Sequence, residues 1–316
     1  MRTTHWLLPT ALAMMVFPAT LLAQSRPSIA AMQAAIDAQA TQIVALQNSV
    51  ADNSVPGLAT FVSVDSSDPA RPSVRISGAN LQVVNNSGST QTANGVGNLI
   101  LGDDELRTAG DATCSVITLT TVGQCLAGGG VWSLNHRTGS HNVIVGDLHN
   151  YTAYASLVSG RGNDVRNIYA SAIGGNSNLA TGDYGVIVGG VLNTVEGTST
   201  VVAGGTGNRA RGTITGVFGG SGNGAGIEKS VVVGGVLNEA LGEGSVVVGG
   251  SANQTLGTWS LVAGGVSNLA SSTGSLVSGG NSNLATGNYS SVSGGFDHIA
   301  AGVFDWVGAG AVFADQ

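Results

Sequence analysis

Three histidines that lie close together are the first candidates for chemistry. His136, His141 and His149 fall within fourteen residues, and Asp147 lies among them. Imidazole and carboxylate groups are ordinary metal ligands, but the spacings of five and eight residues match no ligand motif. The sequence therefore predicts polar turn residues at these positions, and neither a metal nor another cofactor.

Candidate catalytic groups are equally scarce. The segment "GGSGNGAG" at 219–226 is similar to the glycine-rich nonapeptides that bind calcium, but it lacks their recurring aspartate. No Ser-His-Asp or Cys-His set can be nominated, and residues 170–316 carry as basic groups Arg209, Arg211 and Lys229. We therefore predict no enzymatic activity, with a solenoid carbohydrate-active enzyme as the alternative.

The N-terminus has the pattern of an export signal. Arg2 precedes the apolar run "HWLLPTALAMMVFPATLLAQS", which predicts a signal peptide at 1–23, cleaved after Ala23. A transmembrane anchor is the alternative, but Pro9 and Pro18 interrupt the run and no basic cluster follows it. No later stretch is suited to spanning a bilayer. We expect an exported protein, extracellular or at the cell surface, with the periplasm left open.

Charge excludes some partners, and the two cysteines support export. A net charge of −7 and a single lysine argue against nucleic acid and against docking on anionic lipid. Cys114 and Cys125 form an even pair close in sequence, which predicts a disulfide in an exported chain. Closing a loop of this size is worth roughly 2–4 kcal/mol. A metal or redox role would need more ligands or a tighter spacing.

A repeat of fifteen residues dominates the second half of the chain. Gly-Gly doublets begin at Gly174 and recur at that interval as far as Gly294. An asparagine follows each second glycine by three residues, and His298 takes the last such slot. Including one earlier copy, the asparagines are Asn163, Asn178, Asn193, Asn208, Asn223, Asn238, Asn253, Asn268 and Asn283.

This period predicts an all-β fold, a parallel β-solenoid (β-roll) of about ten 15-residue coils over residues 139–303. Helical repeats are longer and need a 3.6-residue stripe that is absent. The residue two places before each doublet is apolar, as at Val232 and Val247, which indicates an inward-facing strand position. Glycine permits unusual backbone angles at a corner, and asparagine tolerates the left-handed conformation and bonds neighbouring backbone. We expect the asparagines to form a ladder.

Two further features predict self-association. Val231, Val233, Val246 and Val248 flank the inward positions and would form an apolar stripe on an outer face, which normally marks an interface. Residues 28–54 show isoleucine or valine every seven residues, typical of a short coiled-coil helix. Both features favour a homotrimer. The alternative for the helix is an amphipathic helix packed on the body.

The remaining segments complete the expected organisation. Residues 58–138 predict short strands with a disulfide loop, in which "GNLILGDD" at 97–104 is an early relative of the repeat, as is "HNVIVGDL" at 141–148. Residues 304–316 are expected to cap the last coil. We assign four aromatic residues to this plug: Phe296, Phe304, Trp306 and Phe313.

The coils resemble the head of the trimeric autotransporter adhesins. Segments such as "SLVSGGNSNLATGNYSSVSGG" match that family in the valine, alanine and glycine exemplified by Val277, Ala285 and Gly287. The resemblance implies a left-handed parallel β-roll of three intertwined chains and an adhesive role toward extracellular matrix, glycan or another cell surface. It departs in carrying two glycines per coil, in a helix that precedes the head, and in a C-terminal segment too short for the family's membrane anchor. We therefore expect release into the medium or retention by a partner.

Overall fold

The computed structural model describes residues 28–52, 58–109, 112–116, 119, 121–308 and 311–313. The expected signal peptide at 1–23 lies outside these residues. The chain divides into two compact units, one ending at Leu81 and the other beginning at Gln82. Residues 82–138 therefore belong to the same compact unit as the repeats.

The first unit contains the helix that the heptad pattern predicts. It consists of α1 (Ile29–Asp52), the single turn α2 (Leu58–Phe61) and an antiparallel pair of strands, β1 (Val62–Asp65) and β2 (Ser73–Ile76). The hydroxyl of Ser28 accepts a hydrogen bond from the amide of Ala31 at 3.1 Å, and so caps the N-terminus of α1.

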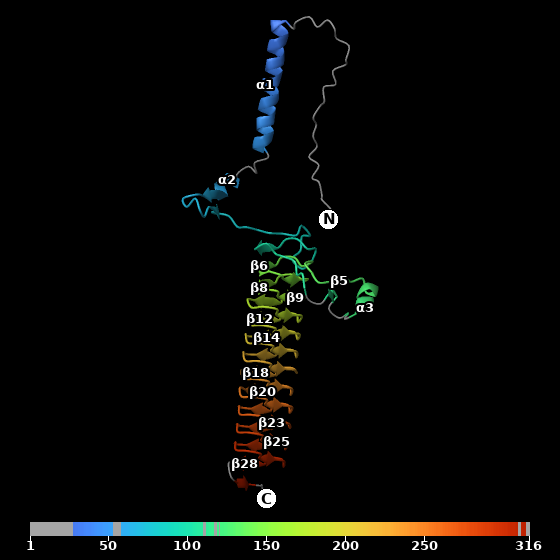
Figure 1. Cartoon of the computed structure of the whole chain (residues 1–316), viewed down its shortest axis with the longest axis vertical. Helices are drawn as coiled ribbons and strands as arrows, with labels where there is room; N and C mark the ends of the chain where they lie inside the picture. The colour runs from blue at the N-terminus through green and yellow to red at the C-terminus, as the bar shows by residue number, and fades with distance from the viewer. Residues whose placement is uncertain are drawn as a thin grey trace. The chain divides into compact units, whose positions relative to one another are not determined.

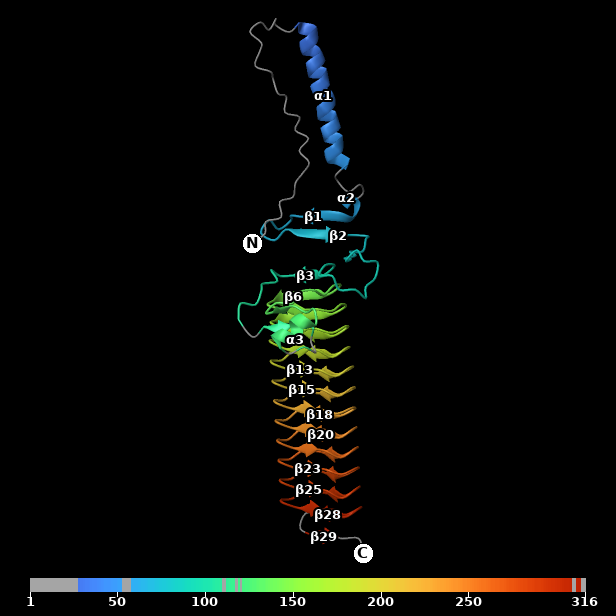
Figure 2. The ribbon, with the colours of Figure 1, turned by 90° about the vertical axis from the view of Figure 1, so that its right-hand side faces the viewer.

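The second unit is a stack of coils, most of which contribute one strand to each of two sheets (Figures 1 and 2). The strands of both sheets run parallel, apart from the last strand of the larger sheet. Sheet I has 14 strands and sheet II has 11. The strands of sheet I are β3 (Leu99–Leu101), β6 (Val143–Asp147), β8 (Leu157–Arg161), β10 (Ser171–Ile173), β12 (Val186–Val188), β14 (Val201–Val202), β16 (Gly216–Val217), β18 (Val231–Val233), β20 (Val246–Val248), β22 (Leu261–Val262), β24 (Leu276–Val277), β26 (Ser291–Val292), β28 (Trp306–Gly308) and β29 (Ala311–Phe313). The strands of sheet II are β7 (Asn150–Tyr151), β9 (Asp164–Val165), β11 (Leu179–Ala180), β13 (Thr194–Val195), β15 (Arg209–Ala210), β17 (Gly224–Ala225), β19 (Glu239–Ala240), β21 (Gln254–Thr255), β23 (Leu269–Ala270), β25 (Leu284–Ala285) and β27 (Ile299–Ala300).

The register of the strands confirms the β-solenoid that the repeat predicts. Ile187 pairs with Val202 and Val232 with Val247, so equivalent residues of successive coils lie side by side, fifteen apart. In the first coils the register is fourteen, because Val143 pairs with Leu157. The 11 strands of sheet II correspond to one coil more than the ten or so expected.

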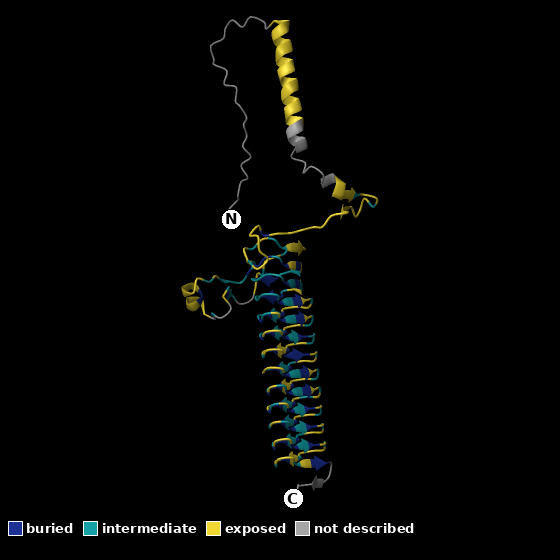
Figure 3. Cartoon of the chain, turned by 180° about the vertical axis from the view of Figure 1, so that it is seen from behind, coloured by how far each residue is buried: buried dark blue, intermediate teal, exposed yellow. Residues whose placement is uncertain are grey.

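Buried residues run along the stack of coils (Figure 3), and those that point between the two sheets form an apolar core. The inward valines of sheet I, such as Val232 and Val247, are fully buried, as are the alanines of sheet II, such as Ala240 and Ala270. Thr255 is a polar exception, and its hydroxyl is satisfied by a 2.9 Å hydrogen bond to the Ser245 hydroxyl. Valine facing alanine therefore sets the thickness of the coil.

The first corner of each coil, from sheet I to sheet II, holds the Gly-Gly doublet and the asparagine. Gly189 and Gly190 both have positive φ, and a Cβ on Gly190 would collide with the carbonyl of Gly205 in the next coil. The amide N–H of Asn208 donates to Oδ1 of Asn193 at 3.0 Å, and Nδ2 of Asn193 donates to two glycine carbonyls. This pattern repeats from coil to coil as a buried asparagine ladder.

The asparagines are not the left-handed residues of this corner. The positive φ falls on the residue before each one, as at Leu192 and Leu237, with φ near 57°. Asparagine is required for its side-chain hydrogen bonds, which satisfy backbone groups that the corner would otherwise bury unpaired.

The second corner, from sheet II back to sheet I, is closed by a hydroxyl. Ser260 donates to the carbonyl of Gly257 at 2.7 Å, and Ser290 does the same to Gly287 at 2.7 Å. Both serines are buried, so these bonds replace water. The residue just before each serine has a positive φ, as at Trp259 and Tyr289.

The early relatives of the repeat are real coil strands. Leu99, Ile100 and Leu101 of β3 pair in parallel with Val143, Ile144 and Val145 of β6. The segment between them leaves the stack as an insertion. It contains β4 (Thr113–Cys114), α3 (Val122–Ala127) and β5 (Trp132–Ser133). The Cys114–Cys125 disulfide, with Cα atoms 5.5 Å apart, joins β4 to α3 as predicted.

The C-terminal end differs from the expected aromatic plug. Strand β29 turns back antiparallel to β28 and ends sheet I. Phe296 is 68% exposed, Phe304 66% and Trp306 47%, so none of the three fills the interior of the last coil. Phe296 and Phe304 lie at corner positions, and Trp306 lies on the outer face of sheet I, where its Nε1 donates to the hydroxyl of Ser293 at 2.7 Å. The side chain of Phe313 lies outside the described set.

Candidate functional site

The outer face of sheet I carries a row of exposed apolar side chains. The exposed fractions are 41% for Ile173, 47% for Val188, 44% for Phe218 and 43% for both Val233 and Val248. Strand pairing aligns these residues, since Ile173 faces Val188 and Val233 faces Val248 in adjacent strands. We call the row formed by Ile173, Val188, Ala203, Phe218, Val233 and Val248 the sheet I row. A continuous apolar row of this kind is a candidate protein interface.

The predicted stripe residues divide between two positions of the strand. Val233 and Val248 belong to the sheet I row, whereas Val231 and Val246 lie two residues earlier and are half-buried. Further along the stack the row continues as Ala263, Ser278 and Ser293 and so loses its apolar character. The candidate interface is therefore limited to the earlier coils.

Helix α1 is also unpartnered along its apolar positions. Ile29, Met32, Ile36, Ile43 and Leu46 are between 46% and 83% exposed. These are the a and d positions of the heptads, which in a coiled coil are buried against other helices. A helix with this pattern in isolation has nothing to stabilise it beyond its own hydrogen bonds.

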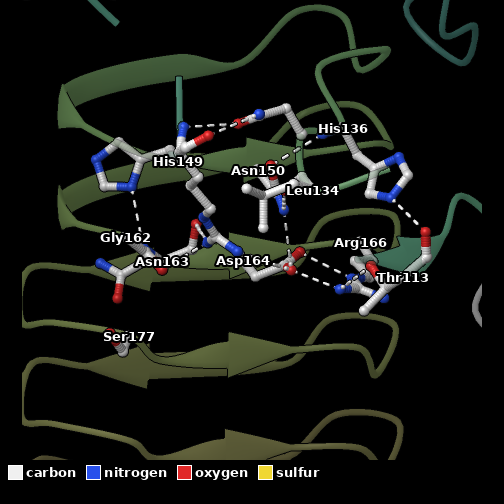
Figure 4. Close-up of polar contacts among 12 residues, drawn as sticks. Thr113, Leu134, His136, His149, Asn150, Gly162, Asn163, Asp164, Arg166 and Ser177 are labelled. Atoms are coloured by element: carbon white, nitrogen blue, oxygen red, sulfur yellow. Dashed lines mark hydrogen bonds and ion pairs between the residues drawn. The ribbon is translucent and has the colours of Figure 1, made fainter. Parts of the chain in front are cut away.

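A charged cluster fastens the insertion to the first coils (Figure 4). Asp164 of β9 is 6% exposed and receives two hydrogen bonds from Arg166, at 2.8 Å from Nε and 2.6 Å from Nη2. Arg166 also donates to the hydroxyl of Thr113 in β4 at 3.0 Å. The carboxylate thus links a coil to the strand that bears the disulfide.

Arg107 approaches the same carboxylate from the start of the insertion. Its Nη1 lies 3.6 Å from Asp164, and it donates through Nε to the carbonyl of Leu148 at 2.7 Å and through Nη2 to that of Gly162 at 2.6 Å. Burial alone would raise the pKa of Asp164, but the hydrogen bonds and charge of Arg166, with the charge of Arg107, hold it below the ordinary value. Burial lowers the pKa of Arg107, the charge of Asp164 acts against this, and the charges of Arg166 and Arg137 add to the lowering.

The three histidines do not converge. His149 is fully buried and occupies the first slot of the ladder, where its Nδ1 accepts from the amide of Asn163 at 3.2 Å. Nε2 therefore carries the proton and faces the carbonyl of Val145 at 3.2 Å. Burial lowers the pKa of His149. His136 instead contacts the carbonyl of Thr113 at 3.0 Å, and His141 lies at a separate turn with φ 55°.

The chemistry available near this cluster is limited. A solvent-open pocket of about 450 Å³ is lined by Arg107, Arg161 and Asp164, among others. Both oxygens of Asp164 are engaged by guanidinium or amide groups, so the carboxylate is held as a structural anion. In the part of the chain that the structure describes, no group of three His, Cys, Asp or Glu side chains is placed to hold a metal ion.

The comparisons with known proteins add no family. No protein-family model matches the chain, and no curated protein matches it either. Among the described residues, no helix is both long and apolar enough to cross a membrane. The fold therefore defines this chain as a parallel β-solenoid protein with an N-terminal helix.

Sequence reasoning missed the charged cluster. Arg107 and Thr113 lie outside the repeat, and nothing in their spacing to Asp164 indicates contact. One signal was available: Asp164 and Arg166 stand at positions that are neutral in most later coils, such as Leu179 and Thr181. An oppositely charged pair at these two positions within one coil occurs in no later coil, and it marks a place where something other than the next coil is bound.

Proposed function

We propose that this chain is an exported, surface-associated homotrimer with an adhesin-like, structural or binding role and no catalytic activity. The observation that carries the proposal is the sheet I row, whose large side chains are exposed by 41–47% over successive coils. A soluble protein seldom leaves so continuous an apolar surface uncovered. Packing three such faces around one axis would bury it.

The heptad pattern of α1 also favours a trimer. Its heptads carry Ile36 and Ile43 at a positions, and β-branched residues there without consistent leucine at d are compatible with a trimer. Three copies of α1 would bury the side chains that are exposed in one. Export rests on the N-terminal sequence pattern and the disulfide.

The test of assembly is the mass of the purified protein, measured by light scattering. The same measurement is made on a variant that places charged side chains in the sheet I row. We expect three times the mass of the mature chain, and partial dissociation on dilution when Val233 and Val248 are both changed to aspartate. Leu256→Asp is the matched control, because Leu256 is 43% exposed on the outer face of sheet II. A monomer at all concentrations would refute the trimer.

The test of function is retention without reaction. The trimer is incubated with matrix proteins, polysaccharides and cell surfaces, and both bound protein and released sugar are measured. Retention without products is the expected result, whereas any saccharide product in a controlled assay would favour the carbohydrate-active enzyme. Fractionation of expressing cells should find the protein in the medium or at the surface, and a purely cytoplasmic protein would contradict export.

A further inference from the structure

The pocket beside the charged cluster gathers positive charge on a chain that has little of it. The sequence holds 11 lysine and arginine residues against 18 aspartate and glutamate residues. Three of the arginines, Arg107, Arg161 and Arg166, line the solvent-open pocket of about 450 Å³. Among the described residues that line it, Asp164 supplies the single carboxylate. Three guanidinium groups therefore face one carboxylate, and the lining carries a positive charge.

The carboxylate of Asp164 is fully occupied. Its Oδ1 accepts from Nε of Arg166 at 2.8 Å, and its Oδ2 accepts from Nη2 of Arg166 at 2.6 Å and from Nδ2 of Asn150 at 3.3 Å (Figure 4). Nη1 of Arg107 lies 3.6 Å from this carboxylate, which is beyond hydrogen-bond distance. That nitrogen therefore retains donors for a second anion.

Arg161 has more donor capacity to spare. Among the described residues its guanidinium has one partner, Asp147, which Nε contacts at 3.3 Å. The two side chains are 64% and 35% exposed, and an exposed ion pair of this kind is weak. The terminal nitrogens of Arg161 are therefore available to a ligand in the pocket.

The repeat does not require an arginine at position 161. Arg161 forms a parallel bridge with Asn176, and this corner position continues along the stack through Val191 and Thr206 as far as Phe296. Every one of the later residues at this position is uncharged. An arginine that occurs here once, in the coil that borders the pocket, points to a role outside the folding of the repeat.

Electrostatics at Arg107 favour an added anion. Burial lowers the pKa of Arg107, the charge of Asp164 acts against this, and the charges of Arg166 and Arg137 add to the lowering. A further anion in the pocket would stabilise the charged form of Arg107 and offset the repulsion among these arginines.

The rest of the lining suits a sugar ring. Leu148 and Leu179 contribute apolar surface, against which the C–H groups of a pyranose can pack. Oδ1 of Asn176 accepts from the hydroxyl of Ser177 at 2.8 Å, so the Nδ2 donors of Asn176 remain for sugar hydroxyls. The volume of about 450 Å³ falls within the range of small-molecule sites.

We infer that this arginine pocket binds the carboxylate-bearing residue of an acidic oligosaccharide. The proposal rests on the proposed binding role of the protein and names a site and a ligand class. A carboxylate is planar and accepts two parallel N–H bonds from one guanidinium group. The carboxylate bonds to Arg107 and Arg161, and the sugar ring contacts Leu148 and Leu179.

A single charged sugar fits this pocket better than other anionic partners do. The chain has a net charge of −7, so the rest of its surface repels a long polyanion such as nucleic acid. A folded protein needs about 20–30 residues on each side of an interface, which is more than one pocket of this size supplies.

The test is isothermal titration calorimetry with acidic sugars and their neutral counterparts. The acidic probes are sialyllactose and trigalacturonic acid, and the neutral probes are lactose and maltotriose. Sodium sulfate and an oligoglutamate peptide report whether any anion suffices. We expect at least one acidic sugar to bind, and to bind more tightly than the neutral sugars, sulfate and the peptide.

Three variants assign the binding to the pocket. Arg161→Gln should weaken it about tenfold, the loss expected for a charge-assisted hydrogen bond. Asp147→Asn should strengthen it, because this change removes the anion that competes for Arg161. Arg209→Gln is the matched control and should leave binding intact, because Arg209 is an exposed arginine that pairs with Glu196 outside the pocket. All three should melt close to the unaltered protein, since each change removes one partner of an exposed ion pair.

Failure to bind either acidic sugar would overturn the proposal, as would equal binding of the neutral sugars, sulfate or the peptide. So would equal losses in Arg161→Gln and Arg209→Gln, or weaker binding by Asp147→Asn. The retention assay is run on the same samples, so that retention on matrix proteins or cell surfaces without binding of acidic sugars would reject the pocket and leave the binding role intact. Light scattering tests the trimer separately.

Discussion

Between residues 143 and 166 the coils keep a 14-residue register and carry a charged cluster that holds the insertion, whereas between 171 and 300 they keep a 15-residue register and share a ladder of neutral amides. The later coils repeat one solution, in which each asparagine satisfies the backbone of its neighbours. The earlier coils also bind an insertion, and Asp164 serves that purpose with two arginines. The hydrogen bonds of the ladder are the same in every later coil, whereas the contacts of the charged cluster occur in one coil alone among the described residues.

The largest effect should come from the charged cluster. Asp164→Asn leaves Arg107 and Arg166, which are 19% and 12% exposed, without their shared carboxylate. Breaking a buried ion pair on one side costs about 3–5 kcal/mol. Chemical denaturation should show this loss, with early proteolysis within the insertion.

The control is Glu196→Gln, which removes a half-exposed partner of Arg209 in a later coil. A surface pair of this kind contributes at most about 1 kcal/mol. If the two variants are equally stable, the cluster does not hold the insertion, and the contrast between the two regions is lost.

The ladder should show a somewhat smaller effect. Asn238→Ala removes the partner of the Asn253 amide and of the Gly234 and Gly250 carbonyls, all within a buried corner. Leaving such groups unpaired costs about 2–4 kcal/mol in sum, since each buried unsatisfied group costs about 1–3 kcal/mol before relaxation. Urea titration measures it.

Asn281 serves as the control for Asn238, because it is an asparagine of the same repeats that lies outside the ladder. It is an exposed asparagine two places before the ladder residue Asn283, and Asn281→Ala should change the free energy of unfolding by less than about 0.5 kcal/mol. If Asn238→Ala and Asn281→Ala lower the free energy of unfolding equally, the ladder hydrogen bonds contribute nothing specific to stability.

The smallest effect is expected in the earlier coils, at His149, the first slot of the ladder. Because its folded-state pKa is lowered by burial, the unfolded chain binds this proton first as the pH falls. Stability is therefore complete above the ordinary histidine pKa of about 6.5 and declines below it, by up to about 1.4 kcal/mol for each unit of pKa difference.

Melting temperature between pH 7.5 and 5 checks this, with His149→Asn as the comparison. That substitution restores the side chain found at the ladder positions of later coils and should flatten the profile. Asp164 does not interfere, because its pKa is held below 3.8. An identical decline in both proteins would contradict the assignment to His149.

The repeat was predictable because its residues are chosen by local geometry. The Gly-Gly doublet, the asparagine and the inward valine each serve the backbone of the next coil fifteen residues away, so their spacing reveals the fold. Even so, sequence alone assigned the left-handed position to asparagine, whereas Leu192 and its equivalents occupy it. The spacing located the corner but did not show which of its residues has the left-handed backbone conformation.

The charged cluster was not predictable for the opposite reason. Arg107, Thr113 and Asp164 are brought together by the path of an insertion that occurs once, and no period connects them. The prediction that aromatic residues plug the last coil was wrong for a related reason. Phe296 and Phe304 occupy corner positions of the repeat, so their side chains point outward. Composition near the end of the chain suggested burial, but position within the coil decided against it.

Each coil of the asparagine ladder bonds only to the coil before and the coil after it, through the same set of contacts. Removing or adding one unit of fifteen residues would therefore recreate an identical junction. A chain with one unit more or fewer would therefore be longer or shorter by about 4.8 Å, while its two ends stay the same.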